Sequence, residues 1–183
     1  MHDTPVGEPT TAGAGFGAAG RALLALSKYA AIGGGLVFVV LVAMEIVSIV
    51  GRKLISAPVP GDVEILQMCA AFASAAFFAY CHLIGGDVKV DFFTHNLAPH
   101  RVALLDAFGS LLVGAFGVLI AWRTWAGAMS LRESGVTSAV LGWPQWISQA
   151  LMVPGFVLLA LAGLYMAWHH LQTAMRSREE ARA

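Results

Sequence analysis

Charged residues are scarce in this chain of 183 residues: they make up 12% of it, whereas hydrophobic residues make up 58%. That is about half the charged fraction of a soluble domain, so the chain has too little polar surface to coat itself in water. The eleven basic and eleven acidic residues give a net charge of zero, and the basic residues form no block. Because such a block is needed to neutralise phosphates, we expect no nucleic-acid partner.

Cysteine is also rare, with only Cys69 and Cys81 in the chain. Twelve residues along a helix cover about 18 Å, which is too far for a disulfide between them. We interpret both as small apolar packing residues.

Motifs that carry chemistry are missing as well. The sequence has no glycine-rich phosphate loop, no nucleophile beside a base, no pair of acids in a cleft-like context and no cluster of metal ligands. We therefore predict that the chain is not an enzyme and has no catalytic residue, cofactor or metal. It also lacks the internal repeat and midplane polarity that are typical of a self-sufficient secondary transporter.

Long apolar runs dominate the chain instead, at residues 29–50, 65–84, 104–129 and 146–168. Each has about 20 residues or more, which as a helix covers the roughly 30 Å of a hydrocarbon core. The runs lack the alternation of barrel strands, so they should be helices. The sequence predicts an all-α integral membrane protein with four transmembrane helices.

The membrane domain should cover residues 21–175. Residues 1–20 are rich in Gly, Ala, Thr and Pro, and we expect a disordered tail there because such a segment buries too little apolar area. We expect residues 176–183 to form a short cytoplasmic tail.

Lysine and arginine positions predict the orientation. Four spans place both termini on one side, and most basic residues fall on that side: Arg21, Lys28, Lys89, Arg101, Arg176, Arg178 and Arg182. The other side has Arg52, Lys53 and Arg132, with Arg123 near a helix end. Both termini should therefore be cytoplasmic. The five tryptophans lie near the predicted span ends, where indole rings anchor helices at the headgroups.

Glu45 is the clearest charged residue within a predicted span. One interpretation is a carboxylate that leans toward the interface or pairs with a cation of a neighbouring chain, with Arg52 on the same helical face. The other is a proton or cation site. We favour the first because no second intramembrane acid completes a relay.

Histidines leave a second alternative open. His82 near the inner end of the second span lies at a similar depth to His169 or His170 in the fourth, and two such rings are a candidate pair of haem ligands. We regard haem as the minor alternative because axial ligands usually lie well inside a bundle. His95 and His100 lie in a polar connection, where solvated histidine is the default.

Two connections carry specific patterns. Prolines and glycine precede Asp62 and Glu64, which predicts Asp62 as the N-cap of the second helix. The pair Gly85-Gly86 should end that helix, and the mixed residues that follow suit a short segment along the inner interface.

The order of these pieces resembles a known family, the small four-span membrane subunit of tripartite ATP-independent periplasmic (TRAP) transporters. The resemblance covers about residues 28–170. It depends on Arg52, Pro58, Asp62 and Glu64, on Gly85-Gly86-Asp87-Val88-Lys89-Val90-Asp91, on Leu97-Ala98-Pro99 with Arg101, and on Pro144, Trp146, Pro154 and Gly155.

The resemblance implies a subunit of the bacterial inner membrane without a transport site of its own. In such systems a periplasmic solute-binding protein delivers a small solute, often an organic acid, to a large many-span subunit driven by a sodium gradient. The small subunit would brace that large one. The family-motif and partner-interface candidates are Glu45, Arg52, Pro58, Asp62, Glu64, Gly85, Gly86, Asp87, Lys89, Asp91, Pro99, Arg101, Gly114, Gly117, Pro144, Trp146 and Pro154.

Small residues in the third span suggest where the partner packs. Gly109, Gly114, Gly117 and Ala121 form a smooth face, and we expect it to support association in lipid. Two rival functions remain open: a haem- or quinone-linked anchor of a redox complex, and a small exporter that uses Glu45.

Overall fold

Four long helices make up the protein. The computed structural model describes residues 16–87 and 99–180, which contain α1 (Ala18–Ile55), α2 (Asp62–Leu83), α3 (Pro99–Glu133) and α4 (Gln145–Glu180). In this part of the chain the only extended pairing is a single bridge between Thr137 and Pro144. Each helix includes a stretch apolar enough and long enough to cross a membrane. The predicted all-α, four-span fold is confirmed.

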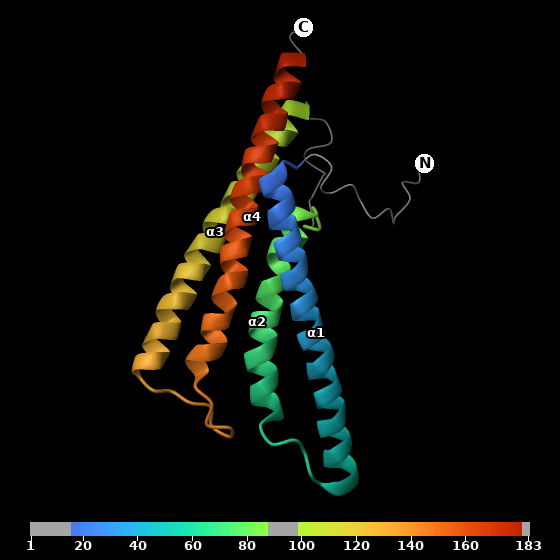
Figure 1. The fold of residues 1–183 in the computed structure, drawn as a ribbon, viewed down its shortest axis with the longest axis vertical. Helices are drawn as coiled ribbons and strands as arrows, with labels where there is room; N and C mark the ends of the chain where they lie inside the picture. Colours follow the sequence, from blue (N-terminus) through green and yellow to red (C-terminus); the bar gives the residue numbers. More distant parts are fainter. Residues whose placement is uncertain (1–15, 88–98, 181–183) are drawn as a thin grey trace.

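The helices are longer than the runs that predicted them. α1 has 38 residues, which gives a length of about 57 Å at 1.5 Å per residue. That exceeds the roughly 30 Å of a hydrocarbon core, so α1 must tilt or extend beyond it. The start of α1 and the end of α4 lie at the same end of the molecule, and the connections α1–α2 and α3–α4 lie at the other (Figure 1). The cytoplasmic location of the termini stays a prediction from charge.

The helices form an open layer rather than a closed bundle. α3 packs against α4, α4 also packs against α2, and α2 packs against α1, while α1 touches α4 only slightly. Among the described residues α3 makes no close backbone approach to α1 or α2. The spatial order is therefore α3, α4, α2, α1, and each outer helix has a single main neighbour (Figure 1).

Small residues hold this layer together. A Cβ atom on Gly163 of α4 would lie 2.4 Å from the backbone N of Gly114 in α3, and one on Gly155 would lie 2.7 Å from the carbonyl carbon of Ala75 in α2. Side chains at these positions would push the helices apart. Close backbone approach without side chains is a common way for helices to associate in lipid.

The contact between α1 and α2 follows a regular spacing. The buried residues of α1 are spaced at intervals typical of a coiled-coil seam and include Ser27, Ala31, Gly34, Leu41 and Ser48. A Cβ atom on Gly34 would lie 2.7 Å from the carbonyl oxygen of Ala73. Most other residues of α1 are left uncovered.

Glycine ends α2 as the sequence predicts. The helix stops at Leu83, Gly85 adopts a φ of 69°, and the N–H of Gly86 donates to the carbonyl of Cys81 at 2.9 Å. This is the Schellman pattern, in which a left-handed glycine lets the chain cover the last carbonyls.

The start of α2 differs from the prediction. Gly61, with a φ of 73°, is the N-cap residue, and Asp62 is the first residue of the helix. The Asp62 carboxylate still accepts the N–H of Val63 at 2.8 Å, so it satisfies a free donor of the first turn from a position one residue later.

Some predictions fall on residues that the structure does not describe. These are the interfacial segment at 88–98, with its candidates Lys89 and Asp91, and the tail residues 1–15 and 181–183. Residues 18–20, placed in the tail by the sequence, belong to α1.

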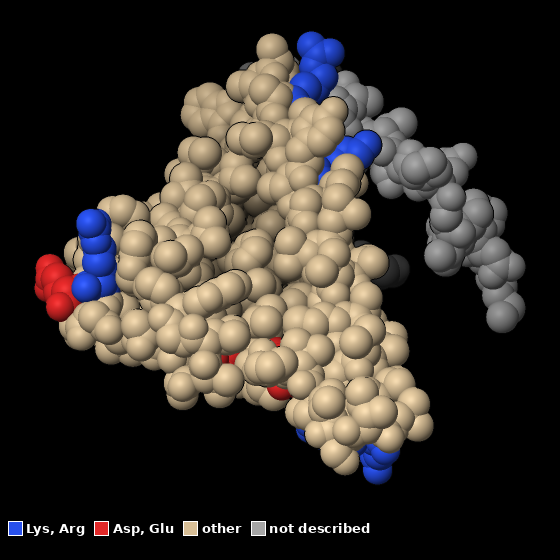
Figure 2. All heavy atoms as spheres, turned by 60° about the horizontal axis from the view of Figure 1, so that its bottom comes forward, with Lys and Arg blue, Asp and Glu red and all other residues tan. Residues whose placement is uncertain are grey.

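Apolar side chains cover most of the described surface. Many large ones are exposed on every helix, such as Val39 at 67% and Trp122 at 71%. Seen from the end that carries the two connections, Lys, Arg, Asp and Glu occupy only small parts of a mostly uncharged face (Figure 2). Such a surface requires lipid or a protein partner.

Candidate functional site

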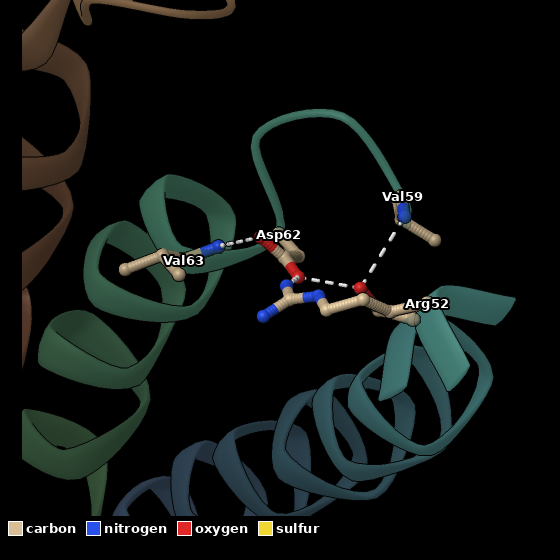
Figure 3. Close-up of polar contacts among 5 residues, drawn as sticks. Arg52, Val59, Asp62 and Val63 are labelled. Carbon is tan, nitrogen blue, oxygen red and sulfur yellow. Dashed lines mark hydrogen bonds and ion pairs between the residues drawn. The ribbon is translucent and has the colours of Figure 1, made fainter. Parts of the chain in front are cut away.

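The connection between α1 and α2 holds a polar cluster around Asp62. Its carboxylate accepts a hydrogen bond from the Ser48 hydroxyl and pairs with Arg52 at 2.9 Å, from Nη2 to Oδ2 (Figure 3). The hydroxyl in turn accepts the N–H of Val59 at 3.3 Å. The Asp62 side chain is 11% exposed and that of Arg52 is 58% exposed. The carboxylate is therefore the buried centre of the cluster, and the arginine covers it from outside.

Glu64 joins the two connections to each other. Its Oε1 accepts the N–H of Val140 at 2.9 Å and its Oε2 accepts the N–H of Leu141 at 3.1 Å, although both donors lie more than seventy residues away in sequence. A Cβ atom on Gly61 would lie 2.6 Å from the Leu141 side chain. These contacts hold the α1–α2 connection and the α3–α4 connection together at this end of the molecule.

The connection between α3 and α4 has its own contacts. Ser138 is buried, its N–H donates to the carbonyl of Trp143 at 2.8 Å, and its hydroxyl accepts the N–H of Trp143 at 3.2 Å. The guanidinium of Arg132 lies over the ring of Trp146 at 5.3 Å, a cation–π contact across the connection. Trp146 therefore has a contact within the chain in addition to its predicted role as an anchor.

Glu45 lies on the same face of α1 as Leu41 and Ser48. Its Oε1 is buried and has no hydrogen-bond partner in the described part of the chain. Arg52, which the sequence places on the same helical face, pairs with Asp62 instead. A buried carboxylate oxygen without a donor is costly. The residue as a whole is only half-buried, so the exposed part of Glu45 is a candidate contact for a group outside this chain.

The opposite end of the molecule carries a buried histidine in contact with an acid. His82 is buried and its Nδ1 contacts the carboxylate of Asp87, while its Nε2 has no partner among the described residues. A cavity of about 230 Å³ lies beside His82 and is also lined by Asp106 and His170.

His169, the other candidate haem ligand, lies outside the lining of that cavity. Its ring packs against Phe16 and Tyr165 with centroid distances of 5.3 and 6.4 Å. Within residues 16–87 and 99–180 no group of three potential metal ligands comes together.

The glycine candidates have a role that the sequence did not reveal. A Cβ atom on Gly117 would lie 2.7 Å from the backbone N of Ala160, and one on Gly114 would lie 3.0 Å from the backbone N of Leu164. Ala121 is also buried, in a cluster with Ala75 and Phe156. This face of α3 is covered by α4 of the same chain, so it is not the partner surface that we expected. Gly109 has open space around it.

The remaining candidates are scattered over the fold. Pro58 and Pro144 are exposed in the two connections, and Pro99 is the first residue of α3. Arg101 is exposed in the first turn of α3, and Pro154 is exposed within α4. The structure does not bring these residues into one site.

The fold and its contacts define a multi-pass membrane protein whose polar side chains mainly fasten the ends of its helices. A family model described as "Tripartite ATP-independent periplasmic transporters, DctQ component" matches residues 38–173, and the chain belongs to this family. The resemblance seen in the sequence is thereby confirmed, and the family is not an enzyme family. No curated protein and no solved structure matches the chain.

Proposed function

We propose that this protein is the small permease subunit of a sodium-coupled TRAP transporter in the bacterial inner membrane. It braces the large transport subunit while a periplasmic binding protein delivers a small solute such as an organic acid. The observation that carries this proposal is the open layer of four helices, which is fastened within itself and leaves wide apolar faces uncovered.

A brace must resist deformation while its partner moves. In this chain the contacts at Gly163 and Gly155 hold neighbouring backbones together, and Glu64 holds the two connections. Interfaces packed this closely have few alternative arrangements, so they transmit force rather than absorb it. Asp62, the buried acid at the start of α2, is already bonded to Ser48 and Arg52, so it does not complete a relay with Glu45, which argues against a transport path within this chain.

Glu45 is our candidate for a polar contact with the large subunit. Its Oε1 lacks a donor inside the described chain, and the residue is only half-buried, so a cation or amide of a partner helix would meet the exposed part of the carboxylate. Polar pairs of this kind stabilise helix association in lipid by about 1 kcal/mol.

Affinity purification in mild detergent tests the assembly. We expect the tagged chain to bring down one large many-span membrane protein in a stoichiometric amount. If the chain elutes alone, or with redox subunits, the assignment as a transporter subunit is wrong.

Transport by the reconstituted complete system tests the remaining claims. Uptake should require the small subunit, the binding protein and an inward sodium gradient, and it should stop when potassium replaces sodium. Vesicles that contain only this chain should take up nothing; uptake by them would instead favour the exporter that uses Glu45.

A further inference from the structure

An apolar groove runs between α3 and α4 at the end of the molecule opposite the two connections. Its floor is formed by Ala107 and Ala167, which are 2% and 9% exposed, and its walls by larger apolar side chains that include Phe108 and Trp168. The hollow measures about 360 Å³. It exists because small residues face each other here between two rows of bulky ones.

The groove continues toward the start of α3. A second hollow of about 480 Å³ shares Leu104 and Leu171 with the first and adds His100 and Arg101. Leu111 lies at the far end of the groove, ten residues along α3 from Arg101, which is about 15 Å of helix. The combined surface is apolar along its length and cationic at one end.

Arg101 lacks a counter-charge in the described part of the chain. Its side chain is exposed, and no ion pair joins it to residues 16–87 or 99–180. The nearest acid along α3, Asp106, lines the cavity beside His82 together with Leu105, whereas Leu104 and Ala107 line the groove.

We propose that this groove binds an anionic phospholipid, with one acyl chain along Ala107 and Ala167 and the phosphate of the headgroup at Arg101. A guanidinium offers paired donors to phosphate oxygens, and basic pockets between transmembrane helices on the cytoplasmic side bind anionic headgroups. Our charge-based orientation places this end of the molecule on that side. The inference is independent of the proposed transport role, because it rests on the shape and charge of this chain alone.

Native mass spectrometry of the full chain in mild detergent tests the site. The delipidated protein is titrated with phosphatidylglycerol and with phosphatidylcholine that carry the same acyl chains. We expect phosphatidylglycerol to bind about fivefold more tightly, the preference that one cation near the headgroups provides. Equal binding of the two lipids would overturn the proposal.

Three variants locate the site. Arg101→Gln should remove the preference for phosphatidylglycerol, while the matched change Arg123→Gln, at an exposed arginine nearer the other end of α3, should leave it intact. Ala107→Leu should fill the floor of the groove and weaken the binding of both lipids. Circular dichroism checks that each variant is folded, and Arg101→Gln, at an exposed position, should pass that check.

A helix of another protein in the groove is the opposing outcome, and the same variants distinguish it from a lipid. A preference for phosphatidylglycerol that survives Arg101→Gln would overturn the lipid site. A second result would also overturn it: a co-purified membrane subunit displaces bound phosphatidylglycerol, and that subunit no longer co-purifies with the Arg101→Gln variant.

Discussion

Arg52 and Asp62 form an ion pair across the connection between α1 and α2, with 2.9 Å between Nη2 and Oδ2. The two partners differ in what their removal leaves behind. Asp62 also accepts the Ser48 hydroxyl and the N–H of Val63, whereas Arg52 is 58% exposed and covers the carboxylate from outside.

Asp62→Ala should therefore lower the melting temperature in detergent more than Arg52→Ala does. Loss of the carboxylate leaves two donors without an acceptor, while loss of an exposed arginine removes only a screened surface pair. Thermal unfolding followed by circular dichroism measures both. Equal losses would mean that the ion pair, and not the buried hydrogen bonds, stabilises this connection.

Gly163 and Gly109 should respond in opposite ways to alanine. Gly163→Ala places a methyl group against the backbone of Gly114 and should destabilise the protein by about 1–3 kcal/mol. Gly109→Ala is the matched control: its Cβ meets open space, and a helical glycine replaced by alanine gains roughly 0.5–1 kcal/mol. Unfolding in detergent compares them, and tolerance of Gly163→Ala would disprove the close contact of α3 with α4.

Glu64→Ala should loosen the connection between α3 and α4. The amides of Val140 and Leu141 lose their acceptors, so their hydrogen exchange should speed up while exchange in the middle of α3 stays slow. Glu133→Ala changes an exposed acid at the end of α3 and serves as the control. Unchanged exchange at residues 140–141 in Glu64→Ala would show that other contacts hold this connection.

Glu45→Leu should leave the isolated chain as stable as before, or make it more stable. The buried Oε1 has no donor among the described residues, so an apolar side chain removes a cost without breaking a contact. The same change should weaken co-purification of the large subunit if Glu45 meets a donor there. A lower melting temperature of the isolated variant would instead reveal a partner of Glu45 within the chain.

Residues near the helix ends show how far sequence reasoning reaches. Gly85-Gly86 predicted the end of α2 correctly, because the left-handed conformation it needs is a local property of glycine. Asp62 was placed one residue early as the N-cap, a small error since the carboxylate still serves the first turn. The pairing of Arg52 with Asp62 had a signal in the sequence, two opposite charges ten residues apart around a turn rich in proline and glycine.

Contacts between distant segments had no such signal. Nothing in the sequence connects Glu64 with residues 140–141, since the bond depends on how two separate connections meet in space. The glycines of α3 were recognised as a packing surface but assigned to the wrong neighbour. Spacing shows which face is smooth, and only the positions of α3 and α4 show what covers it.

The sequence by itself determined that this protein has four membrane-spanning helices and belongs among small TRAP transporter subunits. Span length and apolar content are set by the thickness and chemistry of the bilayer, and both can be counted along the chain. The tertiary structure alone decided that the helices lie in the order α3, α4, α2, α1, with Gly114 and Gly163 in contact and Arg101 at the end of a groove. In lipid every apolar face is equally well solvated, so the choice among neighbours falls to close packing, which depends on three-dimensional shape.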